Sequence, residues 1–254
     1  MNKIKIAYAF NKLGAFVGQI DNIFIDSGDV MHAGRNTLKR FQAGGVNLCV
    51  KSFGRPTIAN IFIYSFFRKT KAERSFLYAQ KLLDRGIRTP RPVAYVVVRN
   101  RLGLLKRSYY ISVYDKVDYT MLEVLENEVP NKQAILNGFV RFMADELHPH
   151  GVYHHDFNGG NVLVTKGLGD NYHYSLVDLN RIQFGREIGY ALGLKHLRGI
   201  SDNPVYLAEL ARFYSAQHKV DANETIYRML FAKYIKVLQR RYTKRFLHSL
   251  KAIF

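Results

Sequence analysis

A short polar stretch, GVYHHDFNGGNVLV at Gly151 to Val164, concentrates residue types that can do chemistry. Within it, His154, Asp156 and Asn161 follow the pattern His-x-Asp-x-x-x-x-Asn. In phosphoryl transfer, an aspartate so placed orients and deprotonates the accepting hydroxyl, and the asparagine supplies an oxygen to a magnesium ion. A polar surface loop with a capping aspartate is the competing interpretation, and this stretch alone does not separate the two.

A second carboxylate follows in SLVDLNR, where Asp178 ends a run of apolar strand residues. A hairpin between the two segments would place Asp178 across from Asn161, where both side chains could share one metal ion. A strand-terminal aspartate is common on its own. The order of the two segments is therefore the more specific signal.

A lysine in a mainly apolar strand is the third feature, because LCVKSF has apolar residues on both sides of Lys51. Burying an ammonium without a partner is costly, so a head group that reaches nucleotide phosphates would explain it. Glu73, on the helix predicted after this strand, is a candidate partner within the charged cluster KTKAERS. An exposed strand lysine is the alternative.

The elements that must position these residues begin with a β-rich first half. Residues 22–27, NIFIDS, are interpreted as a strand, and NTLKRFQ and VNLCVKSF as a hairpin through the turn at Ala43–Gly45. KTKAERSFLYAQKLLDRG predicts a helix that ends at Gly86, and VAYVVVRN and SYYISVY predict two further strands.

The second half is mainly helical. TMLEVLEN and NKQAILNGFVRFMADELHPHG predict helices, NVLVT and YSLVDL predict two short strands, and the pattern is helical again from about Ile188. We therefore expect an α+β chain with two lobes. Residues 1–115 would form a nucleotide-binding β-sheet with one helix, and residues 116–254 a helical lobe with the catalytic loop and a metal-binding hairpin.

In chain order, the strand lysine, the helix glutamate, the His-x-Asp loop and the downstream aspartate resemble the protein-kinase-like fold. Within that fold the sequence resembles the lipopolysaccharide kinase family, through GRNTLKRF, KAERSFLYAQKLLDRGIRTPRPVAYV, HHDFNGGNVLV and LVDLNRIQFG. Members of that family phosphorylate Kdo or heptose sugars in the inner core of bacterial lipopolysaccharide. The resemblance implies an ATP- and Mg²⁺-dependent phosphotransferase whose acceptor is a sugar hydroxyl of this glycolipid.

For the nucleotide, the resemblance implies that Lys51 holds the α- and β-phosphates of ATP and that Glu73 positions Lys51. Residues 114–117 would form the hinge that meets the adenine. The phosphate-covering loop departs from the protein-kinase pattern, because SGDVMHAGRN has Gly28 and Gly34 but no Gly-x-Gly-x-x-Gly.

For the transfer itself, the resemblance implies that Asp156 is the catalytic base and that Asn161 and Asp178 bind Mg²⁺. His154 would brace the loop, and the Gly159–Gly160 pair is expected only to ease a tight turn. Asp178 is followed by Leu-Asn rather than Phe-Gly, and no Ala-Pro-Glu segment follows, which argues against a protein substrate. A protein or small-molecule kinase of the same fold, and a non-catalytic nucleotide- or membrane-binding module, remain the alternatives.

The net charge of +18 indicates an anionic partner: nucleic acid, a phospholipid surface or a phosphorylated substrate. No zinc-ligand spacing, RNA-recognition pattern or helix-turn-helix signal favours nucleic acid. After Glu224 there is no acidic residue, and the last segment predicts a basic amphipathic helix. Its cations are Arg228, Lys233, Lys236, Arg240, Arg241, Lys244, Arg245 and Lys251, and its apolar residues include Phe231, Tyr234, Ile235, Leu238 and Tyr242.

That helix could lie on an anionic membrane, or its apolar stripe could pack on the second lobe with the basic face solvated. The chain has one cysteine, Cys49, and no apolar segment long enough to span a membrane. We expect a cytoplasmic protein. Peripheral contact with the inner face of the inner membrane stays open.

Overall fold

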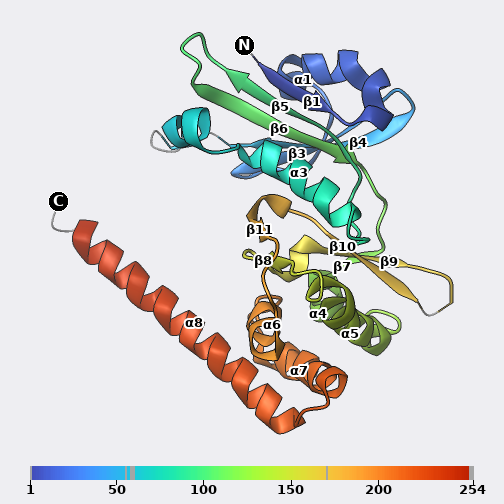
Figure 1. Ribbon diagram of the computed structural model, residues 1–254, viewed down its shortest axis with the longest axis vertical. Helices are drawn as coiled ribbons and strands as arrows, with labels where there is room; N and C mark the ends of the chain where they lie inside the picture. The colour runs from blue at the N-terminus through green and yellow to red at the C-terminus, as the bar shows by residue number, and fades with distance from the viewer. Residues whose placement is uncertain (1, 55, 58–60, 170, 252–254) are drawn as a thin grey trace. The chain divides into compact units, whose positions relative to one another are not determined.

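The computed structural model describes residues 2–54, 56–57, 61–169 and 171–251, without the side chains of residues 240 and 244–251. The chain forms two compact units (Figure 1). The first comprises Met1–Lys116 and Ser175–Asn180, and the second comprises Val117–Tyr174 and Arg181–Phe254. The first unit is built on a β-sheet and the second is mainly helical, so the α+β class predicted from the sequence is confirmed.

A six-stranded sheet with the order β1-β5-β6-β4-β3-β2 forms the first unit. Its strands are β1 (Lys3–Ile6), β2 (Asp29–His32), β3 (Asn36–Ala43), β4 (Val46–Phe53), β5 (Pro92–Arg99) and β6 (Leu105–Val113). The predicted hairpin is β3–β4, and its turn uses Gly44 and Gly45 at φ +55° and +76°, a conformation that glycine adopts without strain. In β4, Lys51 lies opposite Leu38 of β3 and Tyr110 of β6, and is therefore on an interior strand.

The helical segments of the first unit are η1 (Tyr8–Leu13), α1 (Gly14–Asp26), η2 (Ile63–Phe67) and α3 (Lys71–Leu83). The strand expected at residues 22–27 is wrong, because these residues end α1. Val17, Ile20 and Phe24 recur at helical spacing, and all three are buried against the sheet. The six-residue window NIFIDS was too short to show that period.

Helices α1 and α3 cover opposite faces of this sheet (Figure 1). Along β5, Val96 packs with the core beneath α1, whereas Tyr95 and Val97 pack with α3. This follows from the two-residue period of a strand. Helix α3 begins at a capping box, in which the Thr70 side chain accepts from the Glu73 N–H and the Glu73 carboxylate accepts from the Thr70 N–H.

The second unit holds short strands around the predicted catalytic loop and four longer helices. Its elements are β7 (Tyr119–Thr120), α4 (Met121–Glu126), α5 (Lys132–Arg141), η3 (Phe142–Leu147), β8 (Tyr153–His154), η4 (Gly159–Asn161), β9 (Val162–Lys166), β11 (Ile182–Gln183), α6 (Tyr190–Leu197), α7 (Pro204–His218) and α8 (Ala222–Lys251). The chain passes into the first unit within β10 (Tyr172–Leu176) and returns within η5 (Leu179–Arg181).

The buried face of helix α8 is not the apolar stripe that the sequence indicated. Thr225, Met229 and Lys233, four residues apart, are buried, whereas Phe231 and Tyr234 of the expected apolar stripe are 52% and 59% exposed. The packing interpretation of that stripe is therefore wrong. The side chains of four cations in the same prediction, Arg240, Lys244, Arg245 and Lys251, lie outside the described residues.

Membrane crossing by a helix requires a long and mainly apolar segment. Over the residues that the structure describes, none of the helices combines the length and the apolar character needed to cross a bilayer.

Candidate active site

An ion pair joins the strand lysine to the downstream aspartate within the first unit. The Lys51 Nζ lies 2.7 Å from the Asp178 Oδ1, and the Asn180 Nδ2 donates to the same oxygen at 2.6 Å. Asp178 adopts φ +55°, a left-handed conformation that is rare outside glycine and concentrates at functional sites. The sequence pointed to both partners, and the structure brings their charged groups together.

Glu73 has a different partner from the one expected. Its carboxylate accepts from the Lys3 Nζ at 2.5 Å and from the Thr70 N–H, and no described contact joins it to Lys51. Burial raises the pKa of Glu73, but the hydrogen bonds from Lys3 and Thr70 outweigh this, so its pKa is lowered overall. The expectation that Glu73 positions Lys51 is therefore not met in this structure.

The hinge segment begins at Tyr114. The Tyr114 N–H donates to the Asn47 carbonyl at 2.8 Å, and the Arg40 guanidinium lies 5.8 Å from the centre of the Tyr114 ring. These contacts fix the start of the segment against the sheet and use the Tyr114 N–H. Within residues 114–117, a backbone N–H that binds a ligand must therefore belong to a residue after Tyr114.

Asparagine side chains hold the loop of the second unit in which Asp156 and Asn161 lie. The Asp156 carbonyl accepts from the Asn161 Nδ2 at 2.9 Å and from the Asn158 Nδ2 at 3.0 Å. A carbonyl can only accept, so the Asn161 amide must direct its nitrogen to Asp156 and keep its Oδ1 for another partner. An amide oxygen is a suitable Mg²⁺ ligand, and Asn161 is thus oriented to offer one.

The buried His154 side chain supports this loop, as expected. It is 1% exposed, and its Nδ1 accepts from the Asp156 N–H at 3.1 Å. The His154 N–H in turn donates to the His196 Nε2 at 3.0 Å. His196, which sequence reasoning missed, follows the loop by 42 positions and matches no motif there. Burial lowers its pKa well below the ordinary value, which keeps its Nε2 free to accept.

A cavity of about 660 Å³ lies beside Asp156, within the second unit. Its charged lining residues are three carboxylates, Glu126, Asp156 and Asp202, and two cations from α8, Lys233 and Lys236. The Asp156 carboxylate is 50% exposed, and the Arg181 guanidinium lies 3.6 Å from it. A carboxylate at the wall of a polar cavity can accept a proton from a bound hydroxyl, and cations in the same wall can bind an anionic group.

Lys233 fixes α8 at this cavity. Its Nζ donates to the Ser201 carbonyl at 2.5 Å and to the Arg198 carbonyl at 3.3 Å, and it forms an ion pair with Asp202. Arg198 returns a bond to the Ala232 carbonyl at 2.6 Å. These contacts hold α8 against the segment before α7, so Lys236, one turn further on, is a stable part of the wall.

The fold of the chain is that of protein-kinase-like proteins, as a solved structure shows. The solved structure described as WaaP in complex with acyl carrier protein aligns over 95% of this chain and 98% of that chain, with 17% identity and a TM-score of 0.57. The Rio2 kinase-ADP/Mg²⁺-phosphoaspartate complex from Chaetomium thermophilum aligns over 96% of this chain and 76% of that chain, with 12% identity. Its TM-score of 0.48 does not by itself establish a common fold.

The sequence identifies the protein family, which the fold alone does not. The model of the lipopolysaccharide kinase (Kdo/WaaP) family matches residues 32–186. That range covers more than half of the chain, which therefore belongs to this family and is a kinase. No curated protein matches the sequence significantly.

Proposed function

We propose that this kinase transfers the γ-phosphoryl group of ATP to a sugar hydroxyl, on Kdo or heptose, in the inner core of lipopolysaccharide. The observation that carries the proposal is the position of Asp156 at the wall of a polar cavity that also contains Lys233 and Lys236. That lining offers Asp156 as a proton acceptor for a hydroxyl. Because Asp202 holds Lys233, the proposed contact with an acidic group of the acceptor falls to Lys236. Family membership supports the lipopolysaccharide as the source of that acceptor.

On the nucleotide side, ATP supplies the phosphoryl group and Mg²⁺ neutralises charge on it. The residues present fit these groups: Asn161 has an oriented amide oxygen, and Asp178 a carboxylate held beside an ammonium. Lys51 would hold the α- and β-phosphates, Asn161 and Asp178 would bind Mg²⁺, and residues 114–117 would meet the adenine. Glu73 is not assigned to Lys51, because Lys3 and Thr70 hold its carboxylate.

On the acceptor side, Asp156 accepts the proton from the attacking hydroxyl. This step requires a defined position of Asp156, and the bonds from Asn158 and Asn161 to its backbone carbonyl hold the backbone that carries the carboxylate. The Arg181 guanidinium lies 3.6 Å from the same carboxylate, so it is a second charged group beside the attacking hydroxyl.

The test is Asp156→Asn, which keeps the shape of the side chain and removes its basicity. We expect transfer from labelled ATP to purified lipopolysaccharide to fall by about 10²–10⁴-fold, the contribution of general base catalysis, with the melting temperature unchanged. Glu128→Gln is the control, because the Glu128 side chain is 97% exposed and does not line the cavity. Full activity of Asp156→Asn would exclude the proposed role.

The acceptor sugar is resolved by comparing acceptors that end in Kdo with acceptors that carry heptose, with the product located by mass spectrometry. Phosphorylation of a protein or a free metabolite in place of both glycolipids would support the alternative kinase activities instead. Peripheral contact of α8 with an anionic inner membrane is part of the proposal. Its support is that Tyr227, Phe231 and Tyr234 are exposed on the helix that also carries Arg228 and Arg241.

A further inference from the structure

An exposed apolar patch lies on the first unit, in the segment that precedes α3. Phe62, Ile63, Phe66 and Phe67, in and just before η2, are 51%, 42%, 62% and 87% exposed. Large apolar side chains gathered on a surface in this way mark a contact with a partner or a membrane.

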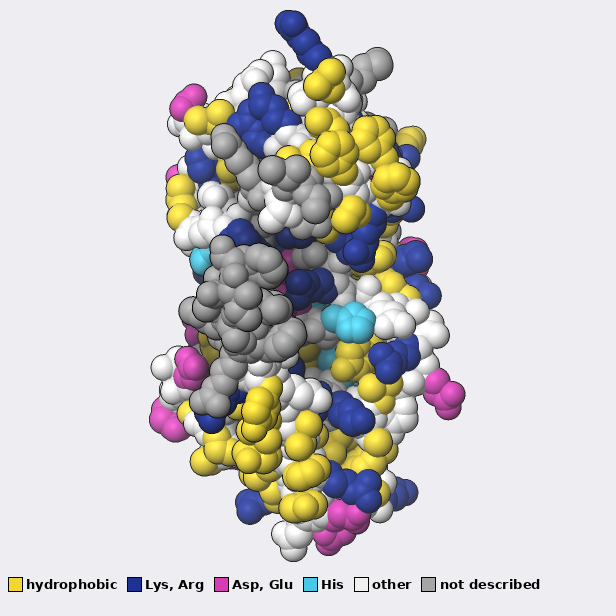
Figure 2. Space-filling model, turned by 90° about the vertical axis from the view of Figure 1, so that its left-hand side faces the viewer, with side chains coloured by type: hydrophobic (Ala, Val, Ile, Leu, Met, Phe, Trp, Pro, Cys, Tyr) yellow, Lys and Arg dark blue, Asp and Glu magenta, His cyan; other side chains and the backbone are white. Residues whose placement is uncertain are grey.

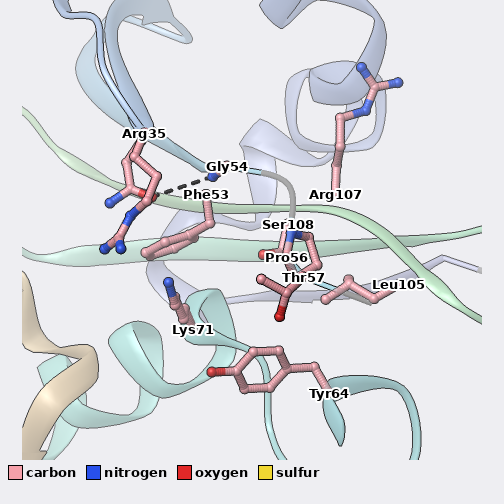
Figure 3. A pocket seen from close by; sticks show the side chains of 11 residues that line it. Arg35, Phe53, Gly54, Pro56, Thr57, Tyr64, Lys71, Leu105, Arg107 and Ser108 are labelled. Atoms are coloured by element: carbon pink, nitrogen blue, oxygen red, sulfur yellow. Dashed lines mark hydrogen bonds between the residues drawn. The ribbon is translucent and has the colours of Figure 1, made fainter. Parts of the chain in front are cut away.

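The segment is anchored, so its exposed side chains are presented by a defined structure. The Ser65 Oγ accepts from the Leu105 N–H at 2.8 Å, and the Arg99 guanidinium joins the Ser65 carbonyl at 3.0 Å to the Gly103 carbonyl at 2.7 Å. Tyr64 lies on the inner side, where it lines a small cavity at the edge of the sheet (Figure 3). Tyr64 and Ser65 thus anchor the segment between two exposed pairs, Phe62–Ile63 and Phe66–Phe67.

Basic residues adjoin this patch along the chain. Arg68 and Lys69 follow η2 directly and are exposed, and the sequence has no acidic residue between Asp29 and Glu73. The turn that Arg99 ties to Ser65 carries the exposed Arg101. Figure 2 shows a gathering of hydrophobic side chains on this unit, with Lys and Arg side chains beside it.

We propose that Phe62, Ile63, Phe66 and Phe67 insert into the interface of an anionic phospholipid surface, with Arg68 and Lys69 contacting its headgroups. Apolar side chains flanked by cations are the composition that binds such an interface. None of the four apolar side chains lines the cavity beside them, so the patch offers side chains to insert and no pocket to fill. A lipid surface accepts inserted side chains without a complementary pocket. The inference does not depend on the proposed sugar substrate.

The test measures co-sedimentation of the full chain with vesicles of phosphatidylcholine alone or with added phosphatidylglycerol. We expect binding to the anionic vesicles only. Phe66→Ser/Phe67→Ser should weaken it at least about tenfold, since insertion of two aromatic side chains is lost. Arg68→Gln/Lys69→Gln should weaken it by a similar factor and reduce its salt dependence.

Leu168→Ser is the matched control, because Leu168 is 92% exposed in the second unit and should not affect binding. Phe231→Ser separates this patch from α8. Binding that survives Phe66→Ser/Phe67→Ser and is lost with Phe231→Ser would overturn the proposal, as would equal binding to both kinds of vesicle. So would failure to bind vesicles together with patch-dependent binding of an acidic protein. Unchanged melting temperatures are expected, because all the substituted side chains are exposed.

Discussion

Gly159→Ala should damage the catalytic loop although it adds only one methyl group. A Cβ at this buried glycine would lie 2.7 Å from the Leu122 N and 2.8 Å from the Leu122 Cα, about 0.7 Å short of ordinary contact. Both atoms belong to the backbone of α4, so a rotamer change cannot relieve the clash. Either α4 or the loop that carries Asp156 and Asn161 must shift. We expect a loss of about 1–3 kcal/mol in the free energy of unfolding, as for overpacking elsewhere.

The same shift should reduce catalysis, because a misplacement of about 1 Å in a reacting group costs roughly 10²-fold. The assay is steady-state phosphoryl transfer with a parallel thermal melt, in which each kcal/mol should appear as about 2–4 °C. Gly160→Ala is the control, because its Cβ would meet only the Asn158 Oδ1, at 3.3 Å. If Gly159→Ala matched Gly160→Ala in both kcat and Tm, the close approach to α4 would not be what requires glycine here.

Two further predictions concern the cavity and the histidines behind the loop. Lys236→Glu should raise the KM for the lipopolysaccharide acceptor about tenfold or more and leave the KM for ATP unchanged, whereas Arg241→Glu, on the same helix outside the cavity, should do neither. Burial, aided by His218, lowers the pKa of His148 from 6.5 to about 4, so stability is full above pH 6.5 and falls as the pH drops toward 4. Urea titrations should show a loss of about 2 kcal/mol from this group near pH 5, and an undiminished pH dependence in His148→Gln would contradict the assignment.

Local patterns predicted the elements whose packing is decided locally. The β3–β4 hairpin follows from two alternating segments around a glycine pair, and α3 follows from one apolar face and Gly86 after its end. The strand assigned to residues 22–27 failed because its apolar residues continue the period of a helix that begins at Gly14. The helical period of the apolar residues is visible over the whole of α1 but not within the six residues 22–27.

Pairings between distant segments were harder to predict. Glu73 was expected to bind the nearest strand lysine, but β1 places Lys3 beside it from 70 positions away. The contribution of α8 to the cavity wall has the same origin, because Lys233 and Lys236 come from the last helix. Each chain position in such a pair is ordinary by itself, and only the fold defines the pair.

The buried histidines explain how a polar loop can rest on an apolar interior. The N–H groups of His154 and Asp156 point inward, and each would cost about 1–3 kcal/mol if buried without an acceptor. The His196 Nε2 and the His154 Nδ1 supply those acceptors, and only an unprotonated ring nitrogen can accept. The proton of neutral His196 must then lie on its Nδ1, 3.2 Å from the His148 Nε2. The position of the Asp156 backbone therefore depends on a chain of neutral histidines, and protonation of that chain would remove the acceptors that hold the catalytic loop.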